Sequence, residues 1–364
     1  MNAQYTRALH NIYTVNLGVK RHESVLVFCD SYSRDLKKIG KGVAQAGKEH
    51  AHRVTFFQYE PTGCHGVEPP DDLWAEAFGK TTCEELRQKN LFKPIGDKKI
   101  TKQQLKEIEE IIGRHKGEAV NAVIALSYYS TSHTRFRDLL NRICGARYAS
   151  MPLFDEAMLA GPMMVDWKGM RERTKGIARR VNRCEMISIE APNGTSMYLS
   201  KRGREAKVDT GIITRQGQFS NLPAGEVYLA PLEGSARGRL VLEWAPTRKL
   251  KNPITLFIEK GCVRDIEGKE KYVSYLQEKL SEKKENRNIA ELGIGTNDRA
   301  KRPDNILESE KILGTIHIAL GDNSSFGGKV STSFHQDFVL FKPTVTLIYG
   351  KGRQRTLMKG GNVR

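Results

Sequence analysis

The sequence predicts an α/β domain with a parallel sheet flanked by helices, followed by an α+β domain that is mainly antiparallel β. Three observations predict this order. Strand and helix patterns alternate through the first half of the chain, and short strand patterns follow one another through the second half. The length of 364 residues also exceeds that of one ordinary domain. We expect domains at residues 1–182 and 183–364.

The first half alternates apolar runs with amphipathic stretches. Strands covered by helices on both faces are apolar throughout, and strand–helix–strand order implies parallel pairing through crossovers. The predicted strands are residues 24–29, 53–59, 120–126 and 149–153, and the predicted helices are 33–47 and 134–143. No GxGxxG follows the first strand, so a dinucleotide site lacks its usual fingerprint.

A stretch rich in Lys and Glu, residues 82–117, interrupts this alternation. Residues 100–112 have the pattern of an amphipathic helix. We expect a surface insertion whose helix is solvated rather than a site for a partner.

The second half begins after a helical linker at residues 166–182. Short strands are predicted at 184–189, 196–200, 240–244, 254–259 and 262–267, with one helix near 272–285. Strands that follow each other without crossover helices indicate an antiparallel sheet or a barrel-like domain.

Acidic and imidazole side chains lie among the apolar residues of the last strands. In the segment 334–340, His335 and Asp337 are two positions apart and point to the same side of a strand. His317 lies between isoleucines, and Glu291 and Glu226 lie in apolar, glycine-rich segments. Each has an ordinary alternative: a hydrogen-bonded His–Asp pair, a core histidine, or a carboxylate that caps a turn or pairs with Arg.

Taken together, three carboxylates and two imidazoles favour a pair of divalent ions over a single structural zinc, which prefers four closed ligands including cysteine. Two ions about 3.5 to 4 Å apart lower the pKa of a bridging water and polarise a carbonyl. Glu226 or Glu291 would then serve as the catalytic base.

These residues give the chain a resemblance to the metalloaminopeptidases of the aminopeptidase T and aminopeptidase S family. The resemblance covers the whole chain and is most specific from residue 221 to residue 337. It implies that five residues ligate two metal ions, Zn, Co or Mn, and that the protein is a homodimer that removes N-terminal residues from peptides. The implied ligands are Glu226, Glu291, His317, His335 and Asp337.

One position departs from that family. The family has a tyrosine seven residues after the histidine of its His-x-Ala-x-Gly strand, and here that position is Ser324. A serine has no phenol, so peptide hydrolysis is placed in doubt. Ser324 and the neighbouring Asp322 and Asn323 are candidates for contacting substrate; the ordinary alternative is a loop that only connects two strands.

The ring-opening dihydroxypyridine dioxygenases also look like this scaffold. By this resemblance, such enzymes hold one Fe(II) ion with two His and one Asp, and their first His occupies the position of Glu291 in this chain. The presence of both Glu291 and His317 therefore favours hydrolysis over the alternative, a mononuclear Fe(II) ring-cleaving dioxygenase. A third hypothesis is a non-peptidase hydrolase or a catalytically silent binding protein, because Ser324 replaces the family tyrosine.

Loops at the carboxyl ends of the first-half strands are further candidates for substrate binding, because ligands of open parallel sheets bind there. They contain His65, Glu68, His133 and Arg135. The ordinary alternative for the last two is a helix cap and a surface residue.

Composition limits the remaining possibilities. The formal charge is +17, but Lys and Arg are interleaved with acidic residues in both halves, so we do not expect nucleic acid as the main partner. No apolar run is long enough to span a bilayer, and no signal-peptide core is present. The six cysteines lack metal-type spacing. We expect a cytoplasmic protein with reduced thiols that acts on a peptide or small molecule.

Overall fold

The computed structural model describes residues 3–364 and divides the chain into two compact units. Unit 1 runs to Met164 and also takes in Gly211–Pro223. Unit 2 comprises Val165–Thr210 and Ala224–Arg364. The boundary falls before helix α9 (Trp167–Asn182), because Ile177 and Val181 of this helix pack into the core of unit 2.

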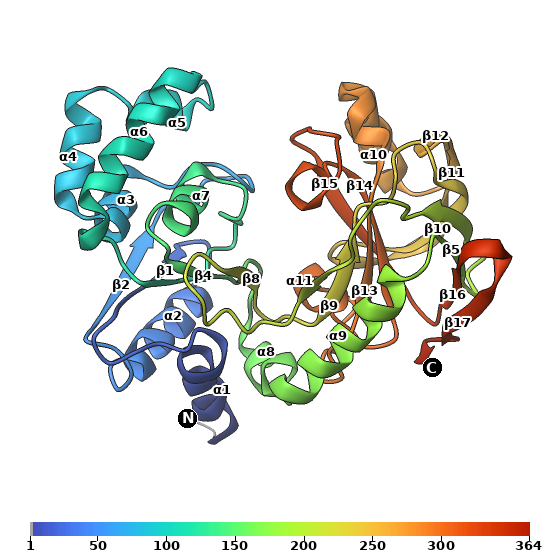
Figure 1. The fold of residues 1–364 in the computed structure, drawn as a ribbon, viewed down its shortest axis with the longest axis horizontal. Coiled ribbons are helices and arrows are strands. Elements are labelled where there is room, and N and C mark those ends of the chain that lie inside the picture. The colour runs from blue at the N-terminus through green and yellow to red at the C-terminus, as the bar shows by residue number, and fades with distance from the viewer. Residues whose placement is uncertain (1–2) are drawn as a thin grey trace. The chain divides into compact units, whose positions relative to one another are not determined.

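Unit 1 is built around one parallel sheet (Figure 1). Its elements are α1 (Ala3–Asn11), η1 (Ile12–Asn16), β1 (Ser24–Asp30), α2 (Arg34–Gly47), β2 (Arg53–Tyr59), α3 (Asp71–Phe78), α4 (Lys80–Gln88), α5 (Phe92–Gly96), α6 (Lys102–His115), η2 (Lys116–Glu118), β3 (Ala122–Ala125), α7 (Arg135–Arg142), β4 (Arg147–Ser150), α8 (Glu156–Ala160), η3 (Pro162–Met164) and β8 (Phe219–Asn221). The strand order is β2-β1-β3-β4-β8, and every pair is parallel.

The residues of β1 alternate between two faces of this sheet. Leu26 and Phe28 share a core with Trp74, Phe136 and Ile111 from helices α3, α7 and α6. Instead of lying apart as a solvated insertion, α6 therefore buries its isoleucine face in the main core. Its Lys and Glu residues cover only the outer face, which explains why composition alone indicated a surface segment.

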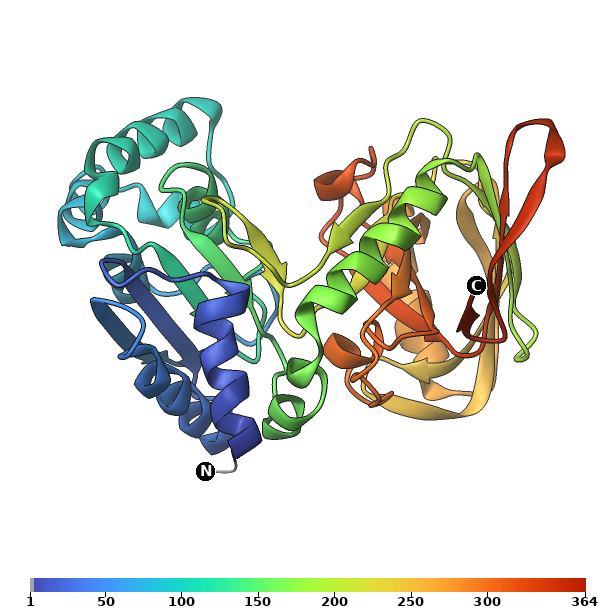
Figure 2. The ribbon, with the colours of Figure 1, turned by 60° about the horizontal axis from the view of Figure 1, so that its bottom comes forward.

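Unit 2 contains two antiparallel sheets. Its elements are α9 (Trp167–Asn182), β5 (Met186–Glu190), β6 (Ser196–Ser200), β7 (Lys207–Asp209), β9 (Glu226–Leu229), β10 (Arg237–Ala245), β11 (Arg248–Glu259), β12 (Cys262–Glu267), α10 (Lys271–Glu282), η4 (Lys284–Arg287), β13 (Ile289–Gly295), α11 (Ile306–Ser309), β14 (Ile316–Gly321), η5 (Ser324–Phe326), β15 (His335–Leu340), β16 (Thr344–Ile348), η6 (Gly350–Gly352), β17 (Gln354–Lys359) and β18 (Asn362–Val363). Figure 2 shows α9 running along these sheets.

An eight-stranded sheet has the order β12-β11-β10-β6-β5-β16-β17-β18, and a five-stranded sheet has the order β15-β14-β13-β9-β7. The core of unit 2 is formed by the apolar faces of both sheets with α9 and α10. The predicted fold class is therefore confirmed: a parallel sheet with helices, followed by antiparallel sheets.

Several elements differ from the prediction at their ends. The strand predicted at 149–153 is β4, two residues earlier, because Arg147 and Tyr148 pair with β3. Strand β8 returns to unit 1 from residues far along the chain, a pairing that periodicity cannot reveal.

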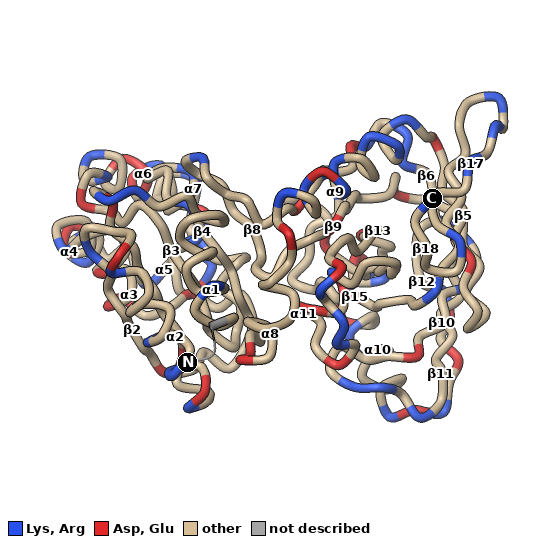
Figure 3. Tube along the Cα trace, turned by 90° about the horizontal axis from the view of Figure 1, so that it is seen from below, with Lys and Arg blue, Asp and Glu red and all other residues tan. Residues whose placement is uncertain are grey.

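Charged residues of both signs are spread over both units, and Figure 3 shows basic and acidic residues interspersed along the chain trace. All six cysteines are free, and Cys64 is exposed. Among the described residues, no helix is both long and apolar enough to cross a membrane.

Candidate metal centre

All five predicted ligand residues lie on one face of the five-stranded sheet of unit 2. Alternation along each strand separates them from the core: Leu292, Ile318 and Phe338 point into the core, so the residues before them point away from it. The polar residues come from four neighbouring strands: Glu226 from β9, Glu291 from β13, His317 from β14, and His335 and Asp337 from β15.

Small residues opposite these side chains make room for them. Ala319 of β14 pairs with both Glu291 and Asp337, which brings the two carboxylates into one row across the sheet. His317 pairs with Gly293, where a Cβ atom would lie 1.9 Å from the imidazole ring. A larger residue at position 293 would therefore displace His317.

Glu291, His335 and Asp337 form the first group of possible metal ligands, with one donor atom of each within 4.8 Å of the others. His335 Nε2 lies 3.6 Å from Glu291 Oε2 and 3.6 Å from Asp337 Oδ2. Donor atoms around an ion with bonds of about 2.1 Å are roughly 3 to 3.5 Å apart, so small shifts would bring these three onto one ion.

The backbone orients His335 for this task. Its Nδ1 lies 2.8 Å from the carbonyl oxygen of Asp322. If Nδ1 carries the proton and donates it to that carbonyl, Nε2 is left with its lone pair toward Glu291 and Asp337. A histidine that ligates a metal is commonly oriented in this way.

Glu226, Glu310 and His317 form a second group, also with donor atoms within 4.8 Å of one another. His317 Nε2 lies 3.5 Å from Glu226 Oε2 and 3.4 Å from Glu291 Oε1, so it joins the two groups. Glu310 is a residue that the sequence reasoning missed.

Lys311, which the sequence reasoning also missed, occupies the position of a metal ion in the second group. Its Nζ lies 2.6 Å from Glu226 Oε1 and 2.8 Å from Glu310 Oε1. Only 1% of its side chain is exposed. The loop after α11 approaches β13 at Gly295, where a Cβ atom would lie 2.1 Å from the carbonyl oxygen of Ile312. This glycine allows the loop to bring Lys311 over the sheet.

Burial and charge act against each other at the basic groups. Burial would lower the pKa of His317, but its bond to Glu291 and the charge of Glu226 raise it to about 9. Burial would likewise lower the pKa of His335, but Asp337 raises it to about 10. The carboxylates of Glu226 and Glu310 raise the pKa of Lys311 above its ordinary value in spite of burial.

The acidic groups show the reverse balance. Burial raises the pKa of Glu226 to about 7 and also raises the pKa values of Glu291 and Glu310. Burial would raise the pKa of Asp337 as well, but His335 holds it below its ordinary value. In the absence of a metal ion, the cluster therefore keeps protons that compensate its excess of carboxylates.

The residues present fit a divalent ion. Four carboxylates face one lysine and two imidazoles, which leaves an excess of negative charge when the imidazoles are neutral. In the second group, Glu226 Oε2 and His317 Nδ1 are buried without hydrogen-bond partners, an uncommon condition for native polar atoms. A cation beside the first group would balance the remaining charge.

The raised imidazole pKa values predict how the stability of the metal-free protein depends on pH. A histidine whose pKa is higher in the folded state than its ordinary value of about 6.5 stabilises the fold, and this contribution is complete below a pH of about 6.5. The contribution is lost as the pH rises through the pKa of the folded state. With folded values of about 9 and 10 for His317 and His335, the free energy of unfolding should fall between pH 7 and pH 10. Urea unfolding with a chelator at several pH values measures this.

A divalent ion would replace the protons, so the metal-loaded protein should lose less stability over the same pH range. A metal-free protein whose stability is constant or rises toward alkaline pH would contradict these pKa shifts.

The loop around Ser324 has an internal structural role. Ser324 is exposed, and its hydroxyl donates to the carboxylate of Asp322. The side-chain oxygen of Asn323 accepts from the backbone N–H of Val330 at 2.9 Å, and its amide donates to Glu233 at 3.3 Å. The contribution of Asp322 to the centre is its carbonyl oxygen at His335.

Two aromatic residues lie beside the first group instead of the family tyrosine. The ring of Phe326 lies 6.0 Å from the ring of His335, edge to face. On its other side it lies 5.8 Å from the ring of Tyr228, which shares the polar face of β9 with Glu226. Burial, with the nearby acidic groups, raises the pKa of Tyr228, so this phenol is neutral at physiological pH.

The four first-half candidates lie in unit 1, whereas the five predicted metal ligands lie in unit 2. His65 is exposed and its Nδ1 accepts from the backbone N–H of Ser130 at 3.0 Å. His133 is also exposed, and Arg135 lies 3.8 Å from Asp138.

Glu68 accepts from the first backbone N–H groups of α7, those of Arg135 at 2.5 Å and Phe136 at 3.1 Å. Replacing Glu68 by alanine should therefore lower the free energy of unfolding by about 1–2 kcal/mol, as loss of a helix cap does. Urea unfolding measures the change. Unaltered stability together with a raised KM would instead assign Glu68 to substrate binding.

Comparisons with known proteins give one family match and one curated relative. The family model described as NicX, 2,5-dihydroxypyridine 5,6-dioxygenase, matches residues 156–350. A curated 2,5-dihydroxypyridine 5,6-dioxygenase from Pseudomonas putida is 26% identical over 170 residues, which cover 42% of this chain and 48% of that protein. This sequence match thus spans about half the length of the relative.

Two solved structures share the fold. The 2,5-dihydroxypyridine dioxygenase of Pseudomonas putida KT2440 superposes with a TM-score of 0.71 at 19% identity, covering 100% of this chain and 98% of that one. AmpT from Thermus thermophilus superposes with a TM-score of 0.57 at 13% identity, covering 99% and 98%. The predicted aminopeptidase scaffold is thus present, but it is shared with the dioxygenase. Because the family model covers more than half of the 364 residues, the chain belongs to the NicX family.

Proposed function

We propose that this protein is a dioxygenase that depends on one divalent metal ion, with Fe(II) as the first candidate. Its substrate class would be dihydroxylated, nitrogen-containing aromatic rings such as 2,5-dihydroxypyridine. Both atoms of O2 would enter the product as one ring bond is cleaved. This was the alternative to peptide hydrolysis, and the family match and the named relative support it.

The observation that carries the proposal is the position of Lys311. Hydrolysis with two metals needs a second divalent ion among Glu226, Glu310 and His317. The ammonium group of Lys311 already contacts a carboxylate oxygen of both glutamates, at 2.6 and 2.8 Å. A divalent ion at the same oxygens would be repelled by this charge. The chain thus has its own cation in one position and leaves the other for a metal.

Glu291, His335 and Asp337 would hold the ion. They provide one imidazole and two carboxylates, a set that suits Fe(II) or Mn(II). His335 and Asp337 have side chains that are 27% and 18% exposed, so solutes can reach this side of the group. When bound, Fe(II) would supply redox chemistry toward O2 at its open coordination positions.

The remaining residues would position the substrate and its protons. The carbonyl of Asp322 fixes the ring of His335. The ring of Phe326 lies next to that of His335, and the ring of Tyr228 lies next to Phe326; both rings could pack against a planar aromatic substrate. His317, between Glu226 and Glu291, is placed to hold or release a proton beside the metal ligands.

The ligand set departs from two His and one carboxylate, because Glu291 stands where we read a histidine in the relatives. His317 compensates for this in part, since its Nε2 lies 3.4 Å from Glu291 Oε1. The group therefore keeps two imidazoles close together, one as ligand and one as neighbour.

The second candidate function is the metalloaminopeptidase activity of the original prediction. The convergence of all five expected ligands on one sheet face favours it, as does the shared fold of AmpT. Lys311 in the second metal position and Ser324 in place of the tyrosine count against it.

Oxygen uptake by the full chain tests the proposal. Protein purified anaerobically and loaded with Fe(II) should consume one O2 per 2,5-dihydroxypyridine, with loss of the aromatic absorbance. The same protein loaded with Zn, Co or Mn should not cleave leucine anilide above background. Anilide hydrolysis without oxygen uptake would overturn the dioxygenase proposal in favour of the peptidase.

A further inference from the structure

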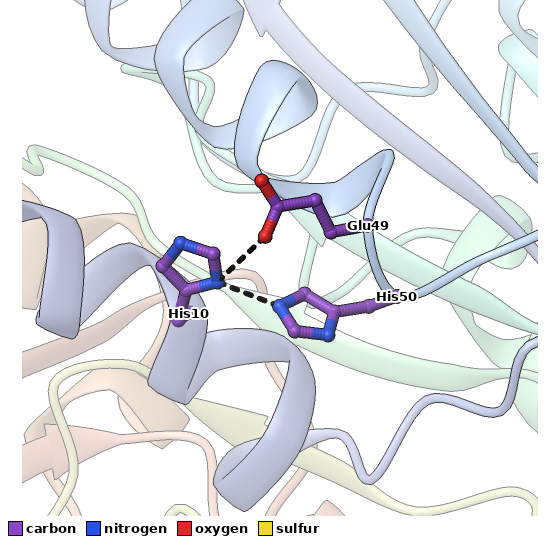
Figure 4. A group of neighbouring side chains, drawn as sticks. All are labelled: His10, Glu49 and His50. Atoms are coloured by element: carbon purple, nitrogen blue, oxygen red, sulfur yellow. Dashed lines mark hydrogen bonds and ion pairs between the residues drawn. The ribbon is translucent and has the colours of Figure 1, made fainter.

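A separate cluster of metal-type residues lies in unit 1. His10 lies in the last turn of α1, and Glu49 and His50 follow the end of α2. Figure 4 shows the three side chains pointing toward one another. One donor atom of each lies within 4.8 Å of the other two. This cluster has no part in the proposed function.

The two imidazoles are unusually close. His10 Nδ1 lies 2.7 Å from His50 Nε2, and 4.0 Å from Glu49 Oε2. Two ring nitrogens at this distance share one hydrogen, so at least one of the facing nitrogens is an unprotonated acceptor. An unprotonated ring nitrogen is also the form that binds a metal ion.

Packing holds the rings in place. The ring of Tyr13 stacks on His50 at 5.7 Å with an interplanar angle of 22°. Tyr13 is itself buried, and its hydroxyl donates to the carbonyl of Val43 at 2.8 Å. Gly47 allows this, because a Cβ atom there would lie 2.4 Å from the Tyr13 ring. The backbone N–H of His50 donates to the carbonyl of Gly47 at 2.9 Å.

The charge around the cluster is mixed. Glu49 provides the only carboxylate of the three, and its side chain is 74% exposed and free to approach. Burial, with the neighbouring His10, lowers the pKa of His50, and Arg21 acts in the same direction. Both effects favour neutral imidazole near neutral pH, while the positive charge of Arg21 opposes a cation and Glu49 offsets it.

We propose that His10, Glu49 and His50 form a binding site for one zinc-type divalent ion. Two imidazoles and one carboxylate are a donor set for zinc rather than for magnesium or calcium, which prefer oxygen ligands. The present donor separations of 2.7 and 4.0 Å lie on either side of the roughly 3.4 Å expected around a tetrahedral ion. Small side-chain rotations, above all of the exposed Glu49, would equalise them. Water would complete the coordination of such an ion.

A bound ion would tie the N-terminal helix α1 to the end of α2. These helices come from different parts of the sequence and pack against each other. An ion that binds only the folded chain stabilises it. The site is therefore structural, and its loss would leave the centre in unit 2 unchanged.

Zinc titration of the full chain without an affinity tag tests the proposal. The double variant His335→Ala, Asp337→Ala serves as background, so that binding at the centre in unit 2 does not contribute. After chelation, this background should bind one equivalent of zinc, with a rise in its melting temperature. Adding His10→Ala or His50→Ala should remove that equivalent. The affinity for zinc should fall by more than the roughly 100-fold that is lost when a residue that only orients a ligand is mutated. Glu49→Gln should weaken it.

His52→Ala is the matched control, because His52 is exposed, two residues beyond His50 and outside the cluster. It should keep the full equivalent. Circular dichroism checks that each variant folds, and His10→Gln replaces His10→Ala if that variant does not. A background that binds no zinc, or equal binding with and without His10 and His50, would overturn the proposal. Neither result would affect the oxygen-uptake test of the dioxygenase.

Discussion

Replacing Lys311 by methionine should lower the free energy of unfolding of the chelated protein by about 3–5 kcal/mol, because removing one partner of a buried ion pair leaves the other charges uncompensated. Here the stranded groups are Glu226 and Glu310, at 2.6 and 2.8 Å from the ammonium. Urea unfolding of the metal-free variant measures the loss.

Two further variants show whether charge is the cause. Adding Glu226→Gln to Lys311→Met should restore part of the stability, since one stranded carboxylate becomes neutral. Lys301→Met, at an exposed lysine that precedes α11, should change stability by less than about 0.5 kcal/mol.

The Lys311→Met substitution should also change the metal content of the protein. Without the ammonium, Glu226, Glu310 and His317 form a second group open to a divalent ion. Lys311→Met should therefore bind one equivalent more of Mn(II) or Zn(II) than the natural protein, and this ion should recover stability. An unchanged stability and an unchanged metal content would show that Lys311 does not act as the second cation.

Replacing His335 or Asp337 by alanine should abolish Fe(II) binding at the centre and reduce oxygen uptake to background. Each provides one of only three donor atoms in the first group. The fold should persist, because both side chains point away from the apolar core of unit 2. Iron content, oxygen uptake and circular dichroism measure these outcomes.

His22→Ala provides the control, since His22 is exposed and belongs to none of the three clusters. It should keep both iron and activity. Full iron content in Asp337→Ala, or unfolding of both ligand variants, would contradict the assignment of these residues as ligands.

Most residues of this centre could be predicted from the sequence, because the alternation of side chains along a strand is a local property. Acidic and imidazole residues at every second position, between branched apolar residues, must share the face opposite the core. Neighbouring strands then bring Glu291, His317, His335 and Asp337 together. The glycines and alanines opposite them, such as Gly293 and Ala319, are a further signal that the sequence contained.

Glu310 and Lys311 were missed because they lie in a loop. The run Glu308-Ser309-Glu310-Lys311 has the composition of a solvated surface segment, and no periodicity indicates that it returns over the sheet. Its close approach depends on Gly295, whose partner, Ile312, lies 17 positions along the chain. This contact decides between one metal and two, so the sequence alone favoured the two-metal hydrolase.

The same limit applies to the fold. The alternation of strands and helices predicted the parallel sheet, but β8 joins it from residues 219–221. Helix α6 is highly charged on its outer face and still buries Ile108, Ile111 and Ile112. Local sequence patterns predict single helices and strands well. They predict long-range strand pairing only where both strands have a distinctive pattern.

The most direct test of the central claim is to locate metal ions by anomalous diffraction in crystals of the natural protein grown with Fe(II) or Mn(II). We expect, in unit 2, a single ion bound by Glu291, His335 and Asp337, with Lys311 still in contact with Glu226 and Glu310. Two ions in this cluster, with Lys311 displaced from both glutamates, would contradict it.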